Sequence, residues 1–176
     1  MLTVIELLSH PVFGEDFRLV SSRSGFYNQV RDSGIFEWEN EEKIAESFHQ
    51  GDFIITTLAA FKDDPERAKE LVKVLIRRKL SALCIKDVYF KEIPEDLISL
   101  ADEYKVPLFL FSETYFDDII FTIKNTLAPD DINSSNIKKI RRILYEDMDD
   151  LEIEITAKEL NPFFHNNIIC GFFIPR

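Results

Sequence analysis

The feature that most constrains the fold is an alternation of short apolar segments with longer amphipathic ones between residues 52 and 127. Three segments are almost wholly apolar and too short for helices, which predicts strands at 53–57, 80–85 and 107–111. The stretches that follow them carry apolar residues at steps of three and four, typical of helices that cover a sheet. Strands of this kind, joined by helical crossovers, form a parallel sheet that is buried on both faces. We therefore predict an α/β fold with a mainly parallel sheet flanked by helices.

Local capping signals set the expected helix boundaries. Asp63 or Asp64 is suited to cap a helix that has Pro65 in its first turn, where a missing amide hydrogen has no cost. Pro94 is expected to open a second helix, and a third is predicted at 117–127. Thr3 and Glu6 have the spacing of a capping box. Before residue 52 we expect helices at 4–9 and 39–48 and strands at 17–20 and 34–38.

The chain changes character after residue 128. Residues 129–135 predict a turn-rich linker, and an amphipathic helix is expected at 137–148. A lone strand is expected at 165–174, and a single strand cannot form a sheet of its own. It either joins the sheet of the first domain or begins a second one, and we favour the second alternative. The expected domains are thus 1–127, a regulatory α/β domain, and 128–176, a linker helix with the start of a second domain.

The charge and the cysteines limit the partners and the compartment. With 32 acidic and 21 basic residues, the net charge of -11 argues against non-specific binding of the whole chain to a nucleic-acid backbone. Any contact with DNA is expected to come from a domain outside this chain. Neither a secretory signal nor an apolar segment of about 20 residues is evident, so we expect no membrane contact. Cys84 and Cys170 lie in apolar runs and are expected to be buried and reduced, which favours a cytoplasmic location.

Patterns typical of enzymes are absent from the sequence. The five glycines form no phosphate-binding loop, and His10, His49 and His165 have no partner at metal-ligand spacing. These histidines are expected at the surface or in helix caps. We therefore expect no enzymatic activity, no metal and no cofactor.

Polar residues at the ends of three predicted strands form the candidate site. Parallel strands end side by side, so Thr56 and Thr57, Lys86, and Ser112 with Glu113 are expected near one edge of the sheet. Two interpretations remain open. The threonines can simply suit a strand and satisfy turn amides, or the group can line a pocket for a small polar metabolite.

An ordered set of short motifs resembles a known family. The set comprises residues 1–8 (MLTVIELL), 51–57 (GDFIITT), 63–66 (DDPE), 82–83 (AL), 93–95 (IPE), 101–103 (ADE) and 106–108 (VPL). In order and spacing over residues 1–127, it resembles the N-terminal domain of purine catabolism regulator (PucR-like) transcription factors. The chain departs from that pattern at Leu58, where the family commonly has a glycine, and in the segment 24–30.

The resemblance implies a sensory module that precedes a middle domain and a DNA-binding helix-turn-helix. It implies a purine-breakdown metabolite as one candidate effector. The apolar face of the amphipathic helix at 137–148 would pack against a neighbouring helix or a second subunit, so we expect this helix to be the transmitter and the protein to form a homo-oligomer, such as a dimer. A ligand-free dimerisation or scaffolding module is the main alternative. An enzyme domain acting on a nucleotide-like substrate is a third possibility, and it lacks convergent acid, base or metal groups in the sequence.

Overall fold

The computed structural model describes residues 2–128 and 130–161, and the chain divides into two compact units, residues 1–127 and residues 128–176. Each unit is described by itself. The strand predicted at 165–174, with His165 and Cys170, lies outside the described residues.

The first unit is built on a five-stranded sheet with the order β1-β5-β4-β3-β2. Its strands are β1 (Arg18–Leu19), β2 (Asp32–Ile35), β3 (Asp52–Thr56), β4 (Ala82–Lys86) and β5 (Leu108–Phe111). The strands β2 to β5 are parallel, and β1 runs antiparallel along the edge of β5. The predicted α/β class with a mainly parallel, helix-flanked sheet is therefore confirmed.

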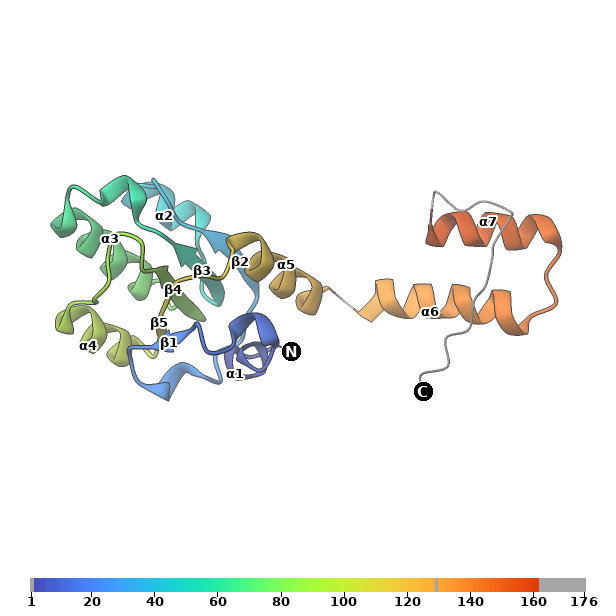
Figure 1. The fold of residues 1–176 in the computed structure, drawn as a ribbon, viewed down its shortest axis with the longest axis horizontal. Coiled ribbons are helices and arrows are strands. Elements are labelled where there is room, and N and C mark those ends of the chain that lie inside the picture. Colours follow the sequence, from blue (N-terminus) through green and yellow to red (C-terminus); the bar gives the residue numbers. More distant parts are fainter. Residues whose placement is uncertain (1, 129, 162–176) are drawn as a thin grey trace. The chain divides into compact units, whose positions relative to one another are not determined.

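Helices cover both faces of this sheet (Figure 1). One face packs against α2 (Glu41–Ser47), α3 (Pro65–Arg77) and α4 (Glu95–Tyr104). The other packs against α1 (Val4–Leu8) and α5 (Phe116–Leu127). Three short 3-10 helices, at Pro11–Phe13, Arg23–Gly25 and Ala59–Phe61, complete the connections. The predicted capping signals are confirmed, because Thr3 and Glu6 form a capping box and Asp64 caps α3 with Pro65 in its first turn.

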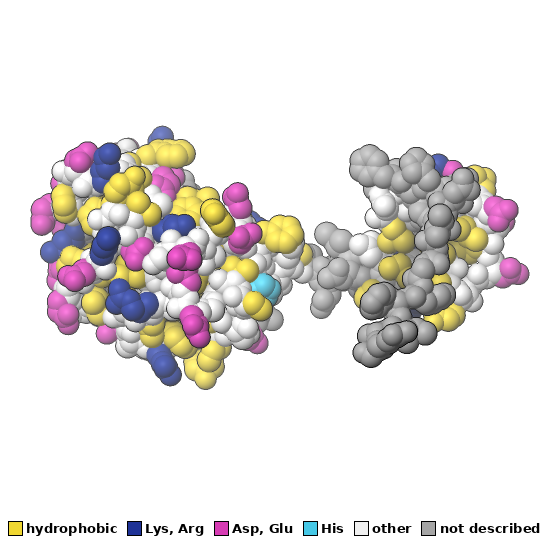
Figure 2. Space-filling model, in the orientation of Figure 1, with side chains coloured by type: hydrophobic (Ala, Val, Ile, Leu, Met, Phe, Trp, Pro, Cys, Tyr) yellow, Lys and Arg dark blue, Asp and Glu magenta, His cyan; other side chains and the backbone are white. Residues whose placement is uncertain are grey.

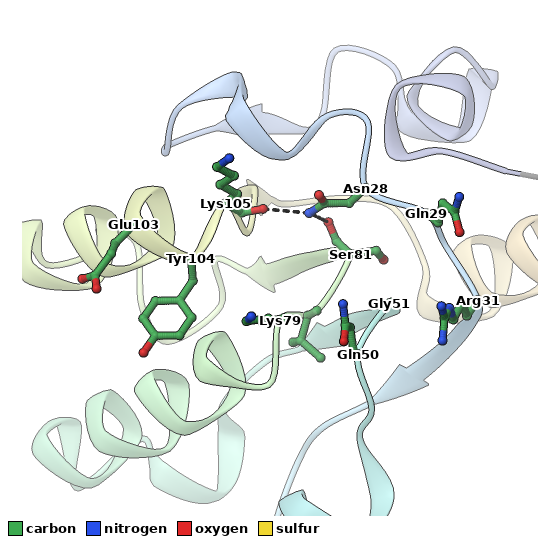
Figure 3. Close-up of a pocket in the computed structure, with 11 residues that line it drawn as sticks. Asn28, Gln29, Arg31, Gln50, Gly51, Lys79, Ser81, Glu103, Tyr104 and Lys105 are labelled. Carbon is green, nitrogen blue, oxygen red and sulfur yellow. Dashed lines mark hydrogen bonds between the residues drawn. The ribbon is translucent and has the colours of Figure 1, made fainter.

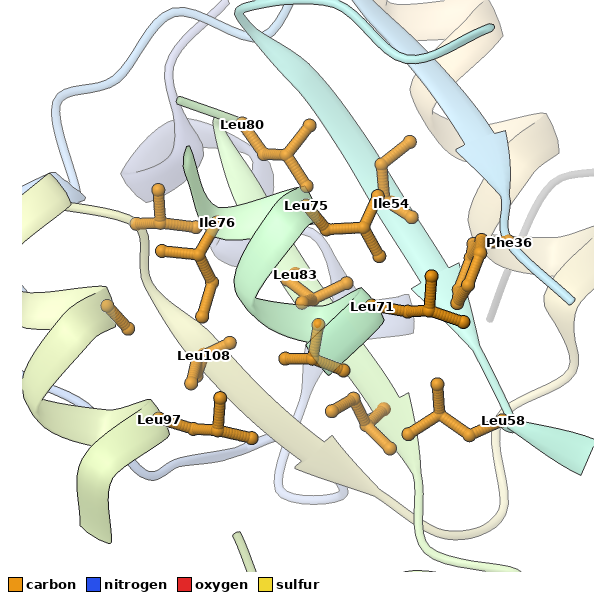
Figure 4. Packing of buried hydrophobic residues seen from close by; sticks show 14 of the residues in the cluster. Phe36, Ile54, Leu58, Leu71, Leu75, Ile76, Leu80, Leu83, Leu97 and Leu108 are labelled. Carbon is orange, nitrogen blue, oxygen red and sulfur yellow. The ribbon is translucent and has the colours of Figure 1, made fainter. Parts of the chain in front are cut away.

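Successive residues of each strand supply two separate cores. Ile54, Leu83 and Leu108 point to the α3 and α4 side, where they meet the buried face of α3 (Figure 4). Phe53, Cys84 and Phe109 point to the opposite side. This alternation follows from the two-residue period of a strand. Because both faces are covered, the strands are apolar at nearly every position, which is what made them recognisable in the sequence.

Two elements of the first unit differ from their predicted form. The strand expected at 34–38 is found at Asp32–Ile35, because Glu37 turns its carboxylate toward Thr57 at the end of the neighbouring strand. The segment expected at 17–20 is a strand, but a two-residue antiparallel one. Neither the pairing partner nor the direction of so short an edge strand is encoded locally.

The second unit contains α6 (Asp130–Tyr145) and α7 (Asp150–Leu160). The turn-rich linker predicted at 129–135 is wrong from residue 130 onward, because acidic residues that suggest a turn also suit the first turn of a helix. The helix predicted at 137–148 coincides with the second half of α6, which ends at Tyr145 rather than at residue 148. Helix α7 was not anticipated, although Asp149 and Glu152 form a capping box.

The surface and the helix lengths add two observations. On the face of the first unit seen in Figure 2, acidic and basic side chains are interspersed, and no continuous basic patch is visible there. Within residues 2–128 and 130–161, no helix has the length and apolar character needed to cross a membrane.

Candidate functional site

The five predicted site residues lie at the carboxyl edge of the parallel strands, but they do not share one open pocket. Thr56 ends β3, Lys86 ends β4, and Ser112 with Glu113 follows β5. Each of them makes hydrogen bonds within the chain, and these bonds decide which groups remain accessible to a ligand.

The two threonines have different roles. Thr56 is fully buried, and its hydroxyl accepts a hydrogen bond from the Leu58 amide at 2.9 Å. Thr57 is half-buried, and its hydroxyl accepts from the Ala59 amide at 3.1 Å. The Thr57 amide and hydroxyl in turn donate to the Glu37 carboxylate at 2.9 and 2.8 Å. Thr56 therefore stabilises the turn, while Thr57 also lines a pocket.

The residue after the threonines has an unusual backbone. Leu58 has φ 57°, in the left-handed region, and its side chain is buried against α3 and α4. Glycine adopts this conformation without steric cost, whereas a side chain with a Cβ is strained there. The chain thus keeps a glycine-like turn but uses the leucine side chain to fill the core.

Lys86 connects the carboxyl edge to an aromatic surface. Its ammonium donates to the Thr114 carbonyl at 3.0 Å and lies 5.8 Å from the ring centre of Phe111 and 5.6 Å from that of Tyr115. A pocket of about 320 Å³ is lined here by Thr57, Lys86, Tyr115, Phe116 and Asp117. Two of the five predicted residues are therefore brought together in one pocket, beside an exposed tyrosine ring.

The backbone amides of Ser112 and Glu113 belong to a cluster of amides that binds a carboxylate of the same chain. The amides of residues 112, 113 and 114 donate to the Asp16 carboxylate at 2.9 to 3.2 Å, and the Thr114 hydroxyl donates to it at 2.7 Å. Burial raises the pKa of Asp16, but these hydrogen bonds outweigh burial and lower the pKa to about 2. The Ser112 hydroxyl donates to Asp87.

Glu37 and Asp16 also belong to the candidate site, and the sequence did not indicate them. Both place a carboxylate on amides that would otherwise be suited to bind an anionic ligand. Glu37 lies 20 residues from its partner, and Asp16 lies more than 90 residues from its own. No local pattern reveals such pairs, because the topology of the sheet brings them together.

A larger cavity, of about 620 Å³, opens at the opposite, amino edge of the same strands. Its lining includes Arg31 before β2, Gly51 before β3, and Ser81 before β4. Lys79 and Lys105, which follow α3 and α4, add two further cations. Asn28 links two segments that line the cavity, because its side-chain amide donates to the carbonyls of Ser81 and Lys105 at 3.2 and 2.7 Å (Figure 3).

Metal ligation is not supported by the described part of the chain. Residues 2–128 and 130–161 contain no group of three or more His, Cys, Asp or Glu that could hold a metal ion. His10 accepts a hydrogen bond from the Val12 amide and so caps a short helix, as expected. Cys84 is a buried free thiol, and burial raises its pKa well above the usual range.

Comparisons with known proteins cover most of the first unit. Residues 6–127 match the model of the purine catabolism regulatory protein-like family (PucR). The chain is 26% identical over 108 residues to the purine catabolism regulatory protein of Bacillus subtilis (strain 168), which corresponds to 61% of this chain and 20% of that relative. The matched segment therefore spans about a fifth of the relative's length.

A solved structure also shows a partial likeness. It is the regulatory region of Clostridium perfringens pyrophosphatase, with its CBS and DRTGG domains, complexed with the activator diadenosine tetraphosphate. The match has a TM-score of 0.46 and 14% identity, and it covers 68% of this chain and 44% of that one.

Proposed function

The chain belongs to the purine catabolism regulatory protein-like family, and from this premise we propose that it is the sensory module of a bacterial transcriptional regulator. In this proposal the first unit binds a small polar metabolite of the purine-catabolism type. The bound state is conveyed to a DNA-binding domain that lies outside this chain. The module works in the cytoplasm, where such a regulator meets its DNA.

The observation that carries the proposal is the pocket around Thr57 and Lys86. It combines a hydroxyl, a cation, the Asp117 carboxylate and the ring of Tyr115, which is 73% exposed. Aromatic faces stack on planar molecules, and the polar groups offer both donors and acceptors. Since Glu37 and Asp16 already occupy the nearby amides, the pocket favours a neutral planar ligand over an anion.

Signal transmission requires that the effector prefers one arrangement of the protein over another. The Lys86 ammonium bridges β4 to the loop before α5 through the Thr114 carbonyl. A ligand that competes for this ammonium would shift that loop and the start of α5. Helix α6 follows α5 in the chain, and we assign it the role of transmitter.

Thermal unfolding against a panel of purines and allantoin-type ureides tests the proposal. A ligand at 100 times its dissociation constant stabilises the fold by about 2.7 kcal/mol, which raises the Tm by roughly 5–10 °C. The rise should be lost in Lys86→Met and retained in Lys91→Met, an exposed lysine that the pocket does not include. If no compound on the panel raises the Tm, the sensory proposal fails at this pocket.

A ligand-free dimerisation module is the second candidate function, and exposed apolar side chains on α6 favour it. Ile137, Ile140 and Leu144 lie at helical spacing, and each is at least 46% exposed. A surface stripe of this kind is typical of a helix that packs against another one. Sedimentation velocity should then show a dimer that Leu144→Glu converts to a monomer, whereas Glu146→Lys, just after the end of α6, leaves it intact.

A further inference from the structure

The cavity at the amino edge of the sheet has cationic side chains in its lining, whereas at the carboxyl edge carboxylates of the chain occupy the amides. It is lined by Arg31, Lys79 and Lys105, with Glu103 as a single carboxylate. Among the residues that the structure describes, none forms an ion pair with these three cations. In a chain with a net charge of -11, this is a local excess of positive charge around a concave surface.

A buried hydroxyl in the same cavity has no partner. Ser81 is fully buried in the cavity wall, and its side-chain oxygen makes no hydrogen bond with any described group. Buried polar groups are almost always hydrogen-bonded, so the Ser81 hydroxyl has hydrogen-bonding capacity that the described residues do not use. Ser81 lies at the centre of the residues drawn in Figure 3, between the wall that holds Asn28 and the wall that holds Lys79.

The backbone at the cavity rim is also unusual. Of the four described residues with positive φ, three line this cavity: Gly51, Lys79 and Lys105. The left-handed residue that ends a helix is most often glycine, because a Cβ is strained there. Here two helix ends instead have lysine in that position, each with φ 57°. The sequence thus keeps two cations at positions where glycine is conformationally better suited.

From these observations we infer that the amino-edge cavity binds a small anion with two or more negative charges, of the phosphate-ester class and of nucleotide size. The guanidinium of Arg31 can bind a phosphate through two parallel hydrogen bonds, and Lys79 supplies a point charge. The volume of about 620 Å³ lies within the range of small-molecule pockets. Tyr104 offers a ring for stacking, and the amides of Gln29 and Gln50 can bind the polar edge of a base.

This site is separate from the proposed effector pocket. In the view of Figure 3, the Lys79 side chain lies between Tyr104 and Gln50, and Arg31 lies on the other side of Ser81. Lys86 and Thr57 are at the opposite ends of the strands and are not part of this cavity. An anion bound here and a neutral effector bound near Lys86 would therefore occupy different regions of the first unit.

Isothermal titration of the full chain with pyrophosphate, AMP, adenosine and citrate tests the inference, with the four ligands compared at one ionic strength. We expect pyrophosphate and AMP to bind, and a second series at higher NaCl should show weaker binding of both. Adenosine should bind at least tenfold more weakly than AMP. Absence of binding by both phosphates, or equal binding of adenosine and AMP, would overturn the inference, and tighter binding of citrate would overturn the phosphate-ester class.

Matched variants locate the site. Arg31→Gln and Lys79→Gln should each weaken AMP binding about tenfold or more, since each removes a charged hydrogen bond. Lys91→Gln and Lys86→Met should leave AMP binding unchanged, which separates this site from the effector pocket. Ser81→Ala should weaken binding, while Ser33→Ala, the other described buried hydroxyl without a partner, should not. If the double variant, with Arg31→Gln and Lys79→Gln together, binds AMP with unchanged affinity, the anion binds elsewhere and the assignment is refuted.

Discussion

Asp16 shows how a single carboxylate can fix a loop that lies far away in the sequence. Its oxygens accept hydrogen bonds from three successive amides and one hydroxyl after β5, so the charged form is stabilised in the folded state. The folded pKa of about 2 lies below the usual value of 3.8. A depressed pKa contributes stability that is present above the unfolded pKa and is lost as the pH falls through the folded one.

Asp16→Asn should therefore destabilise the chain by about 1–2 kcal/mol at pH 7, a figure reduced because the site is partly exposed to solvent. The difference from the unmodified chain should stay constant between pH 7 and pH 5 and shrink between pH 4 and pH 2. Urea unfolding across this range measures it. Asp63→Asn, at an exposed position, is the control and should show little change at any pH. A difference that grows on acidification would contradict the assigned cause.

Two residues with the same backbone conformation should respond in opposite ways to glycine. Leu58 and Lys105 both have φ 57°, but Leu58 is buried and Lys105 is exposed. Lys105→Gly relieves the left-handed strain and should stabilise the chain by up to about 1 kcal/mol. Leu58→Gly gains the same relief but loses a buried side chain, so a net loss of about 1–3 kcal/mol is expected. Chemical unfolding of both variants without ligand tests this, and a stabilised Leu58→Gly would show that strain outweighs burial.

At the scale of elements, the short helix Arg23–Gly25 depends on close contact with the loop after α4. A Cβ on Gly25 would lie 2.2 Å from the Lys105 carbonyl oxygen and 2.5 Å from Cδ of Pro107, so backbone would have to move. Gly25→Ala should cost about 1–3 kcal/mol, with a correspondingly lower Tm. Gly14→Ala is the matched control, because its Cβ would meet only the Pro11 carbonyl oxygen, at 3.3 Å. Equal Tm values for the two variants would show that this segment is not packed as described.

The elements differ in how far the sequence predicts them. The strands β3, β4 and β5 and the helices between them were predictable, because strands buried on both faces are apolar throughout and the helices have capping residues. Strand β1 is a two-residue edge strand whose direction depends on its partner β5. Helix α6 begins in a segment whose polar residues suit turns as well as helices, so local propensity could not separate the two.

The candidate site was less predictable than the fold for a related reason. The sequence correctly places Thr57 and Lys86 at one edge of the sheet, since parallel strands end side by side. It does not reveal that Glu37 and Asp16 fill the amides there, because these contacts depend on the strand order. The cations at the opposite edge come from three different connections, and only the assembled sheet brings Arg31, Lys79 and Lys105 to one cavity.

At the scale of the whole molecule, the two hydrophobic clusters show where the folding unit ends. All of their members lie between residues 2 and 127, and α5 contributes Ile119 and Ile123 to one of them. A fragment of residues 1–127 contains every one of these side chains. It should therefore fold without the rest of the chain and unfold in one cooperative transition, because a domain needs only its own core to be stable.

We expect the Tm of the 1–127 fragment to lie within about 4 °C of that of the full chain, because removing residues outside the core should change the free energy of unfolding by less than about 1 kcal/mol. Its responses to AMP and to the neutral panel should be retained, because both cavities are lined by residues of this unit. A fragment of residues 1–115 is the matched control. It lacks α5 and so leaves part of the Phe53 and Phe111 face of the sheet uncovered, because α1 alone remains on that face, and it should fail to fold cooperatively. A 1–127 fragment that unfolds as poorly as the shorter one would show that residues after 127 complete the core, and the two-domain division would then be wrong.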